Sequence, residues 1–390
     1  MRRRGHAVTI ATSTAYRARV EAADLAFHAV RPNVDLDDRE LLAYVMDTRR
    51  GSERVVRYLA ELVRESYADT LPAAREADLI VTHPVTFAAV VVAQKLRMPW
   101  VSTVLAPLSL MSAIDPPVPP QTPWLHKLRV FGPGLMKRLW DTASRQTMAW
   151  LQPVLDLRQE LGLPPGENPL FDGSHSPARV LALFSRYLAA PQADWPPNTV
   201  ATGFAFYDRG ELPPELDAFL AAGPAPVVFT LGSSAVGAAG SFYVESLAAV
   251  KRAGCRAVFL TGPHPQGLPH ALPDGVIAQA YAPHGALFPH AAVIVHQGGI
   301  GTTAQAMRSG RPELVVPFGH DQFDNGARVA RCGAAEVLYQ SRYNAPRAAE
   351  RLHRLLNEPR CAQAADTLSQ RVKSEDGARG AADAIERSLT

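Results

Sequence analysis

The sequence predicts an α/β protein of two doubly wound domains that face a central cleft. A chain of 390 residues is too long for one ordinary hydrophobic core and fits two domains of roughly 150 to 200 residues each. Short apolar runs alternate with helix-length segments, as in parallel sheets whose strands are joined by helices. This alternation restarts after the proline-rich segment 211–226. We therefore assign residues 1–212 to an N-terminal domain, 213–226 to a linker and 227–390 to a C-terminal domain.

Six short apolar segments predict the strands of the N-terminal domain. They are Ala7–Thr12, Ala26–Val30, Leu79–Thr82, Trp100–Leu105, Val180–Phe184 and Thr199–Thr202. Helices are expected at 39–68, 85–95 and 135–161, the last with a kink at Pro153. A further proline-rich segment, "IDPPVPPQTP" at 114–123, predicts an ordered loop beside the active site.

The C-terminal domain is expected to hold six more strands, each separated from the next by a helix-length segment. They are Val227–Leu231, Ala257–Thr261, Val276–Ala280, Ala292–His296, Leu314–Pro317 and Ala335–Leu338.

The first residues, "MRRRGHAVTIATS", resemble the end of a helix followed by a strand. Three arginines suit the last turn of a helix, and Gly5 can adopt the positive φ of a C-cap. No helix precedes them, so we expect the chain to enter a βαβ unit halfway through. An ordinary basic amino terminus before a first strand is the alternative.

Composition excludes several classes of function. A net charge of +3 and 20% charged residues indicate a soluble globular protein, without the dense basic patches that bind nucleic acid. The apolar run "FAAVVVA" at 87–93 is far shorter than the roughly 20 residues of a membrane span. Peripheral contact with a membrane stays open. Cys255, Cys332 and Cys361 show no metal or disulfide spacing, which suits a cytoplasmic protein with buried structural thiols.

The stretch "HQGGIGTT", residues 296–303, follows the apolar run "AAVIV" and opens a predicted helix. A helix begins with unpaired backbone N–H groups and a positive dipole end, and glycines let a diphosphate approach the backbone closely. Gly299 and Gly301 would supply this close approach, and the Thr302 and Thr303 hydroxyls can add donors. The stretch therefore predicts a phosphate cradle.

A dinucleotide-binding fingerprint is the competing interpretation of the same residues. Residues 299–304 satisfy G-x-G-x-x-A, and Asp321 follows about 20 residues later. In a dehydrogenase this motif would open the first βαβ unit of its domain, whereas roughly three strands precede it here. We therefore disfavour a nicotinamide cofactor.

The segment 281–325, "YAPHGALFPHAAVIVHQGGIGTTAQAMRSGRPELVVPFGHDQFDN", resembles the nucleotide-sugar-dependent glycosyltransferases of family 1, especially the bacterial members near sterol, glycopeptide and rhamnolipid glycosyltransferases. The similarity covers nearly the whole chain. It implies the GT-B fold, in which two Rossmann-like domains face a central cleft. It also implies a nucleotide sugar as substrate, without a metal ion or other cofactor, and the sequence shows no D-x-D pair.

The resemblance assigns roles to the residues of this motif. Tyr281, in place of the more usual tryptophan, would stack on the nucleobase, and His284 would contact the edge of the base. Gln297 occupies the position of the usual phosphate-binding histidine. An amide carries no charge, so we expect diphosphate affinity to depend more on the helix end and on His296. Gln305 falls where many relatives hold the ribose with a glutamate.

Further donor contacts are implied outside the glycine stretch. Asp321 and Gln322 match the acid-amide pair that reads the hydroxyls of the donated sugar, although Asp321 could also act as a helix N-cap. Ser233 and Ser234, in "TLGSSAVG", resemble serines that reach the donor phosphates, with a plain serine-rich turn as the alternative.

The catalytic base is the unassigned part of the site. In the family it is a histidine or aspartate in a loop after the first strand, and the resemblance implies that this strand, loop and helix, roughly 25 to 30 residues, are missing here. Exposed sheet edges and aggregation are then expected. His83, at the end of a predicted strand, is a weak candidate base that we expect to position the acceptor or to be structural. Asp115 is a weaker candidate.

The sequence thus predicts an inverting transferase that moves a hexose or deoxyhexose from a UDP- or dTDP-sugar to a hydroxyl of a small hydrophobic acceptor, such as a lipid, sterol, polyketide or phenolic. We expect activity to be impaired if the base is absent. A nucleotide-sugar-binding pseudoenzyme and a nucleotide-sugar epimerase are the alternatives. Acceptor contacts are expected from 107–131 and 204–209.

Overall fold

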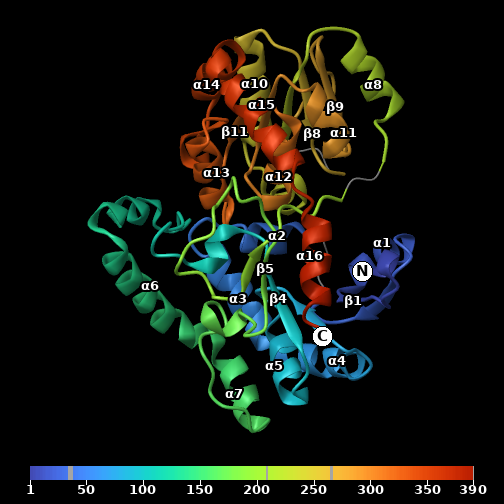
Figure 1. The fold of residues 1–390 in the computed structure, drawn as a ribbon. Coiled ribbons are helices and arrows are strands. Elements are labelled where there is room, and N and C mark those ends of the chain that lie inside the picture. Colours follow the sequence, from blue (N-terminus) through green and yellow to red (C-terminus); the bar gives the residue numbers. More distant parts are fainter. Residues whose placement is uncertain (34–37, 208–209, 264–266, 390) are drawn as a thin grey trace.

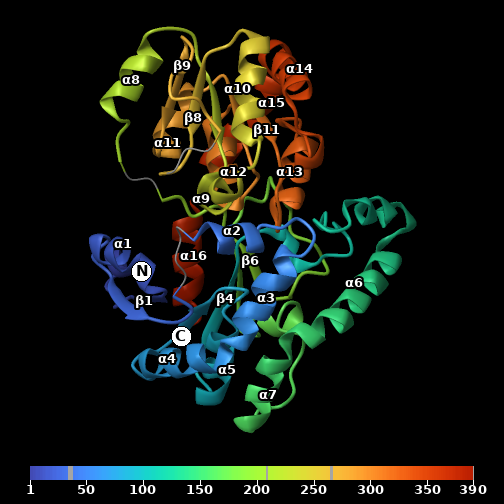
Figure 2. The same ribbon diagram turned by 180° about the vertical axis from the view of Figure 1, so that it is seen from behind.

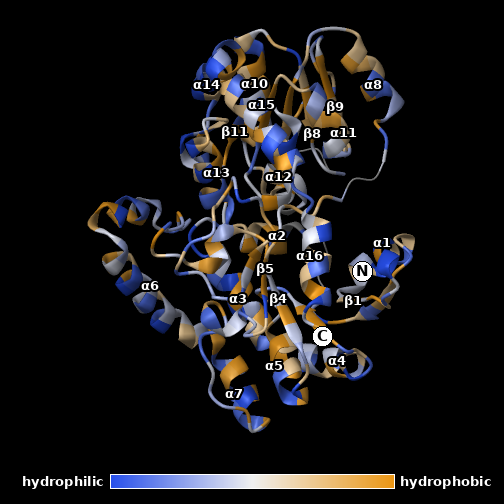
Figure 3. Cartoon of the chain, in the orientation of Figure 1, coloured by the Kyte–Doolittle hydropathy of each residue, from blue (hydrophilic) through white to orange (hydrophobic). Residues whose placement is uncertain are grey.

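The computed structural model describes residues 1–33, 38–207, 210–263 and 267–389, apart from the side chains of Arg39 and Ser234. Figure 1 shows two stacked lobes, with the C-terminal domain above the N-terminal domain. The strands of both domains are hydrophobic, whereas hydrophilic residues are frequent on the outer helices (Figure 3).

A six-stranded parallel sheet with the order β12-β11-β10-β7-β8-β9 forms the centre of the C-terminal domain. Its strands are β7 (Val227–Thr230), β8 (Ala257–Leu260), β9 (Val276–Gln279), β10 (Val293–His296), β11 (Glu313–Val315) and β12 (Ala335–Val337). The six strands predicted for this domain are therefore confirmed. The strands β8 and β9 continue the sheet on the side of β7, and β11 and β12 continue it on the side of β10. The segments that follow β7 and β10 therefore meet where the strand order reverses, which is where ligands of open α/β sheets bind.

Helices cover both faces of this sheet because alternate residues of each strand point to opposite sides. Phe229 of β7 faces the helices α10 and α14, whereas Val228 faces α8, α11 and α12. The helices of this half are α8 (Pro214–Ala221), α9 (Gly232–Ala235), α10 (Phe242–Ala253), α11 (His284–Leu287), α12 (Ile300–Ser309), α13 (Gln322–Arg331), α14 (Ala345–Asn357), α15 (Pro359–Lys373) and α16 (Gly377–Glu386).

The six strands predicted for the N-terminal domain are also present, but they form two sheets. The strands β3 (Ile80–Thr82), β4 (Trp100–Val104), β5 (Val180–Ala182) and β6 (Thr199–Ala201) form a four-stranded parallel sheet. The strands β1 (Thr9–Thr12) and β2 (Ala26–Ala29) pair separately, also in parallel. Because β1 pairs with β2 and β3 with β4, each of β1 and β3 has one neighbouring strand within the described residues.

The predicted long helices of this domain are divided by turns. The helices are α1 (Arg17–Ala22), α2 (Arg39–Val45), α3 (Gly51–Glu61), α4 (Val63–Arg75), α5 (Phe87–Leu96), α6 (Pro133–Thr147) and α7 (Gln152–Glu160). Between α2 and α3 the Asp47 carboxylate accepts the backbone N–H groups of Arg49 and Arg50, at 2.9 and 2.6 Å, and stabilises a turn. Between α6 and α7 a 3₁₀ turn precedes Pro153, which has no N–H donor for a continuous helix.

The first residues show the helix-end geometry that the sequence predicts. Arg2–Arg4 form a single 3₁₀ turn, and Gly5 follows with φ 90° and donates its N–H to the Arg2 carbonyl oxygen at 2.9 Å.

The two domains share elements across the assigned boundaries. Within the segment expected as a linker, α8 buries Leu216 completely against the C-terminal sheet. At the end of the chain, α16 returns to the N-terminal domain, where Ala384 packs on Val101 of β4 and Leu181 of β5. Val372 of α15 lies in the same apolar cluster as strand residues of the N-terminal sheet. The domains are therefore joined by a continuous apolar core as well as by the chain.

Candidate active site

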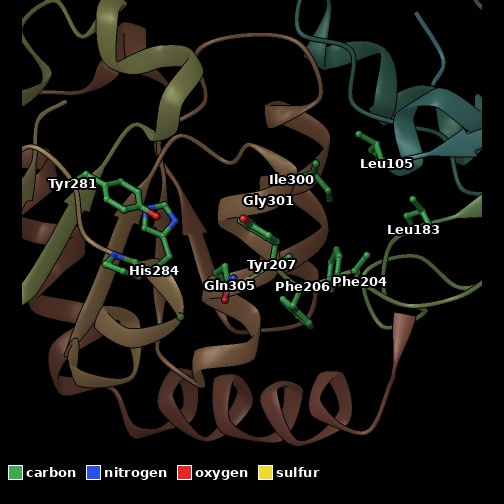
Figure 4. Close-up of a pocket in the computed structure, with 14 residues that line it drawn as sticks. Leu105, Leu183, Phe204, Phe206, Tyr207, Tyr281, His284, Ile300, Gly301 and Gln305 are labelled. Atoms are coloured by element: carbon green, nitrogen blue, oxygen red, sulfur yellow. The ribbon is translucent and has the colours of Figure 1, made fainter. Parts of the chain in front are cut away.

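A cavity with a volume of about 380 Å³ lies where the two domains meet, beside the start of α12. Its lining from the C-terminal domain is Tyr281, Pro283, His284, Gly285, Ile300, Gly301, Ala304 and Gln305, and from the N-terminal domain Leu105, Leu183 and residues 204–207. Figure 4 shows Tyr281 and His284 at one end, Leu105 and Leu183 at the other, and Gln305 and Tyr207 between them. The cavity thus opens at the carboxyl ends of parallel strands from both domains.

The start of α12 is open toward this cavity. Gly299 is the N-cap residue, with an extended backbone, and a Cβ built on Gly301 would meet no atom within 4 Å. Gly298 is different, because it has φ 88° and a Cβ there would lie 2.9 Å from the Gln322 carbonyl oxygen. One glycine therefore permits the tight turn out of β10, and the other leaves space at the positive end of the helix.

His296 holds the glycine loop from inside the protein. Its ring is fully buried at the end of β10, where Nε2 lies 2.9 Å from Glu313 Oε2 and Nδ1 accepts the Gly298 N–H at 3.1 Å. Burial raises the pKa of Glu313, although the hydrogen bond from His296 opposes the rise. Both ring nitrogens are therefore occupied. The expectation that His296 adds to diphosphate affinity needs correction, because its ring has no donor left to reach a phosphate.

Gln297 and the two threonines are also buried. The Gln297 side chain packs under Gly232 and Gly299, and its Nε2 lies 3.4 Å from Thr302 Oγ1. Thr303 is completely buried and its hydroxyl oxygen has no partner among the described residues. As placed, the Thr303 hydroxyl cannot contribute the donor that the sequence suggested. Of the first turn of α12, Ile300 and Gly301 line the cavity, and the Ile300 N–H already donates to the Asp321 carboxylate.

The end of the cavity at Tyr281 has the features of a base-binding site. Tyr281 is 67% exposed and lines the cavity (Figure 4), so its ring can stack on a flat ligand. His284 stacks on Phe288 with a centroid separation of 4.5 Å. Burial, together with nearby His296, lowers the pKa of His284 to about 4, so the ring is neutral at pH 7 and offers hydrogen bonds without charge.

The acid-amide pair lies at the turn between β11 and α13. The Asp321 carboxylate accepts the Asn325 Nδ2–H at 2.7 Å and makes no N-cap hydrogen bond. Burial raises the pKa of Asp321 to about 6, while Asn325 and the Ile300 backbone N–H oppose the rise. The carboxylate thus stands beside the first N–H of α12. Gln322 is buried, and its Oε1 accepts the backbone N–H groups of Phe318 and Gly319 at 2.8 and 3.1 Å. Its oxygen is therefore occupied, and neither Asp321 nor Gln322 is among the residues that line the cavity.

A segment of the N-terminal domain covers this side of the site. Figure 2 shows α2 directly below α9. Leu42 of α2 lies against Gly237, and the Thr48 hydroxyl donates to the Phe318 carbonyl oxygen at 2.7 Å. Ser233, at the start of α9, is exposed, and the Ser234 side chain lies outside the described part of the chain.

Several lining residues were not assigned to the donor site by sequence reasoning. Three of them come shortly after β4, β5 and β6, respectively: Leu105, Leu183 and Phe204. Their position after strand ends is the sequence feature that could have identified them. Residues 204–209 were expected to contact the acceptor; 204–207 line the cavity opposite Tyr281, and 208–209 are not described. Asn325 was also missed, although it joins Gly298 to Asp321 through hydrogen bonds of 2.9 and 2.7 Å.

Neither candidate base, His83 or Asp115, lines the cavity. The His83 Nδ1 accepts the Val85 N–H at 3.4 Å, so the neutral ring carries its proton on Nε2, and burial lowers its pKa. Asp115 is bound by Arg328 and Arg331 of α13; burial opposes its ionisation, but the two arginines outweigh burial and lower its pKa.

Among the described residues, no three His, Cys, Asp or Glu side chains gather as metal ligands. None of the helices in the described ranges is long and apolar enough to cross a membrane.

Comparison with known proteins gives the family. Residues 258–386 match the C-terminal domain described as erythromycin biosynthesis protein CIII-like. The chain is 32% identical to O-mycaminosyltylonolide 6-deoxyallosyltransferase of Streptomyces fradiae, over 99% of this chain and 92% of that protein. It is 26% identical to a sterol 3-beta-glucosyltransferase of Arabidopsis thaliana, over 99% of this chain and 61% of that protein.

Solved structures show the same fold. Glycosyltransferase VinC in complex with DTDP superposes with a TM-score of 0.68 at 22% identity, covering 100% of this chain and 93% of that one. Spinosyn rhamnosyltransferase SpnG gives a TM-score of 0.69 at 20% identity, covering 100% and 92%. The interdomain cavity, the parallel sheets and the full-length relative agree, and the chain therefore belongs to the nucleotide-sugar-dependent glycosyltransferases of the GT-B fold.

Proposed function

We propose that this glycosyltransferase moves a deoxyhexose or hexose from a dTDP- or UDP-sugar to a hydroxyl of a bulky hydrophobic acceptor, with inversion at the anomeric carbon. The observation that carries the proposal is the cavity at the open start of α12, flanked by Tyr281 and Gln305. A 6-deoxyallosyltransferase at 32% identity favours a deoxyhexose, and its named substrate and the sterol of the glucosyltransferases favour a large apolar acceptor.

In the proposed reaction the acceptor hydroxyl oxygen attacks the anomeric carbon, the bond from that carbon to the diphosphate oxygen breaks, and the nucleoside diphosphate leaves. The hydroxyl proton passes to a base, a role that no described residue is assigned. The developing negative charge would lie at the start of α12, where backbone N–H groups and the helix dipole stabilise it. Tyr281 would stack on the base, and Gln305 would contact the ribose. Gln322, held by the backbone at 318–319, would present its amide nitrogen to the sugar, and Asp321 would accept hydrogen bonds from its hydroxyls.

Binding of the nucleotide tests the donor half of the proposal. We expect dTDP and UDP to bind in calorimetric titrations, and Tyr281→Ala to weaken binding about tenfold, since base–aromatic stacking contributes about 1–3 kcal/mol. Tyr58→Ala is the control, because Tyr58 is a partly exposed tyrosine of α3 outside the cavity. If neither nucleotide binds to the folded protein, or Tyr58→Ala weakens binding as much, the donor site is wrongly placed.

Turnover separates the proposal from its alternatives. Incubation with a dTDP-deoxyhexose and a panel of macrolactone and sterol acceptors, followed by mass spectrometry, should show an acceptor heavier by one sugar. Nucleotide binding without any transfer would favour a pseudoenzyme. A change of the sugar without acceptor, seen by NMR, would favour an epimerase.

A further inference from the structure

A second cavity, with a volume of about 290 Å³, lies inside the N-terminal domain between α5, α7 and the segment 164–177. Figure 1 shows α5 and α7 at the end of the molecule away from the C-terminal domain, so this cavity is remote from the cavity between the two domains. Its wall is mixed: Phe87, Val91, Trp100 and Val154 are among the apolar lining residues, and Arg158, Glu167 and Asp172 are charged. The proposed function gives it no role.

A buried arginine stands in this wall. Arg158 of α7 is 8% exposed, and its Nε donates to the carbonyl oxygens of Pro164 and Pro165 at 3.0 and 2.9 Å. Nη1 donates to Gln94 Oε1 at 2.5 Å. No carboxylate of the described residues forms an ion pair with Arg158, and burial lowers its pKa. A buried guanidinium without a counter-charge is costly, so an anion would be stabilised beside it.

Neighbouring residues pack closely against the Arg158 guanidinium, but one of its nitrogens, Nη2, keeps N–H donors that are unpaired within the part of the chain that the structure describes. Gly166, with φ 77°, lies so close that a Cβ there would be 2.8 Å from Cζ and Nη2. Nη2 donates to no acceptor in the described residues, although a guanidinium has five N–H donors. The arginine is therefore fixed in position with donor capacity unused at the wall of a cavity.

His175 also lines this cavity. Both of its ring nitrogens are buried, so as placed the ring offers no hydrogen bond to a ligand. Burial lowers the pKa of His175, and Asp172 and a hydrogen bond with the Ser109 backbone partly offset this.

We propose that this cavity binds a small monocarboxylate with a compact apolar body. Its carboxylate would pair with the Arg158 guanidinium, and its body would lie against Phe87, Val91 and Trp100. A planar guanidinium matches a carboxylate in geometry, and the apolar part of the wall matches a short aliphatic or aromatic group. Glu167 and Asp172, exposed at the edge of the cavity, disfavour a dianion such as phosphate.

Ligand-observed NMR and calorimetry with benzoate and hexanoate test the proposal. We expect a Kd on the order of 0.1–1 mM for the full chain, as is usual for ligands of this size. Benzamide, the neutral counterpart of benzoate, and inorganic phosphate should bind at least tenfold more weakly. Absence of benzoate and hexanoate binding to the folded protein overturns the proposal, as does equal binding of benzamide or tighter binding of phosphate.

Two variants locate the binding. Arg158→Gln, which removes the charge, and Val91→Phe, which fills the cavity with an apolar ring, should each weaken benzoate binding at least tenfold. Arg64→Gln is the matched control, because Arg64 is an exposed arginine of neighbouring α4 paired with Glu160. Circular dichroism checks folding, and if Arg158→Gln is unfolded, Val91→Phe decides alone. Unchanged binding in folded Val91→Phe, or an equal loss in Arg64→Gln, overturns the proposal.

Discussion

Gly298 and Gly301 lie three residues apart at the start of α12, and their surroundings give them opposite tolerance to a side chain. Gly298 has a positive φ, with the Gln322 carbonyl oxygen 2.9 Å from a hypothetical Cβ, whereas Gly301 faces open space. Sequence reasoning treated the glycines as one cradle. Whether a side chain is tolerated at each glycine depends on the atoms that the fold places next to it.

The same substitution at these two glycines should therefore have opposite effects on stability. We expect Gly298→Ala to lower the free energy of unfolding by about 1–3 kcal/mol, through strain and close contact. Gly301→Ala should leave it equal or raise it by up to about 1 kcal/mol, since alanine favours the helix. Urea unfolding of the two variants measures this. Equal destabilisation would contradict the placement of Gly301 at an open helix end.

The raised pKa of Asp321 predicts that ionisation of this carboxyl lowers the free energy of unfolding at higher pH. The folded carboxyl titrates at about 6 and the unfolded one near ~3.9, so between these values the folded protein holds a proton that the unfolded chain has released. The contribution of Asp321 to stability is therefore lost as the pH rises through this window. Asp321→Asn should be about 3 kcal/mol more stable than the wild type at pH 8, and no more stable near pH 4.

Thermal or urea unfolding at these two pH values measures the difference. Asp78→Asn is the control, because Asp78 is exposed and should give the same small change at both values. A stability gain for Asp321→Asn that does not depend on pH would show that packing, and not ionisation, is the cause.

At the scale of elements, a close approach between backbone atoms positions the start of α16. A Cβ on Gly377, the first residue of α16, would overlap the carbonyl oxygens of Gly203 and Phe204, whereas a Cβ on Gly380 has its nearest neighbours at ordinary contact distance, 3.4 Å or more. Since Phe204 lines the cavity between the two domains, the position of α16 and the shape of that cavity are linked.

Gly377→Ala should therefore displace α16, while Gly380→Ala should not. We expect Gly377→Ala to lower the free energy of unfolding by about 2 kcal/mol or more and to increase amide hydrogen exchange in β4, β5 and α16. Gly380→Ala should keep or slightly raise stability. Equal exchange in the two variants would mean that α16 does not depend on this close approach.

The helices and strands also show which features the sequence predicted and which it did not. All twelve strands of the described residues were predicted, because each is a short apolar run between turn signals, which is a local property. The break at 46–50 was missed because the Asp47 carboxylate accepts two nearby backbone N–H groups, and these local hydrogen bonds compete with continuation of the helix. The pairing of β1 with β2 apart from β3 is a long-range outcome that no window of sequence contains.

For the whole molecule, an ion-pair cluster joins the proline-rich loop of the N-terminal domain to α13. Arg328, 2% exposed at its side chain, pairs with Asp324 at 2.7 Å and with Asp115, and Arg331 lies 3.1 Å from Asp115. The Val118 backbone N–H also donates to Asp324 at 3.0 Å. Because α13 begins next to Asp321, this cluster fixes the loop expected to contact the acceptor relative to the sugar end of the site.

Asp115→Asn should loosen the domain interface. We expect it to lower the free energy of unfolding by about 1–3 kcal/mol at pH 7, because buried Arg328 loses one of its two carboxylates. The pKa of Asp115 is lowered, so the difference should shrink as the pH falls below about 4 and the wild-type carboxyl protonates.

Asp141→Asn is the matched control for this change. Asp141 pairs with Lys137 on the surface of α6, at side-chain exposures of 48% and 71%, and its loss should cost less than about 0.5 kcal/mol. Small-angle scattering should also show larger dimensions for Asp115→Asn only. Equal stability of the two variants would remove the cluster as a determinant of domain geometry.

By itself, the sequence determined the α/β class, the strands and the glycine loop, because periodicity, turn residues and helix ends are encoded within a few neighbouring positions. It also indicated that Tyr281, Gln305 and Gly301 belong together, and they do line one cavity. Only the tertiary structure decided that His296 faces Glu313 inside the protein, that Thr303 is buried, and that Asp115 is held by arginines. The direction and the partner of a polar side chain depend on burial and on residues up to about two hundred positions away, and no local pattern records them.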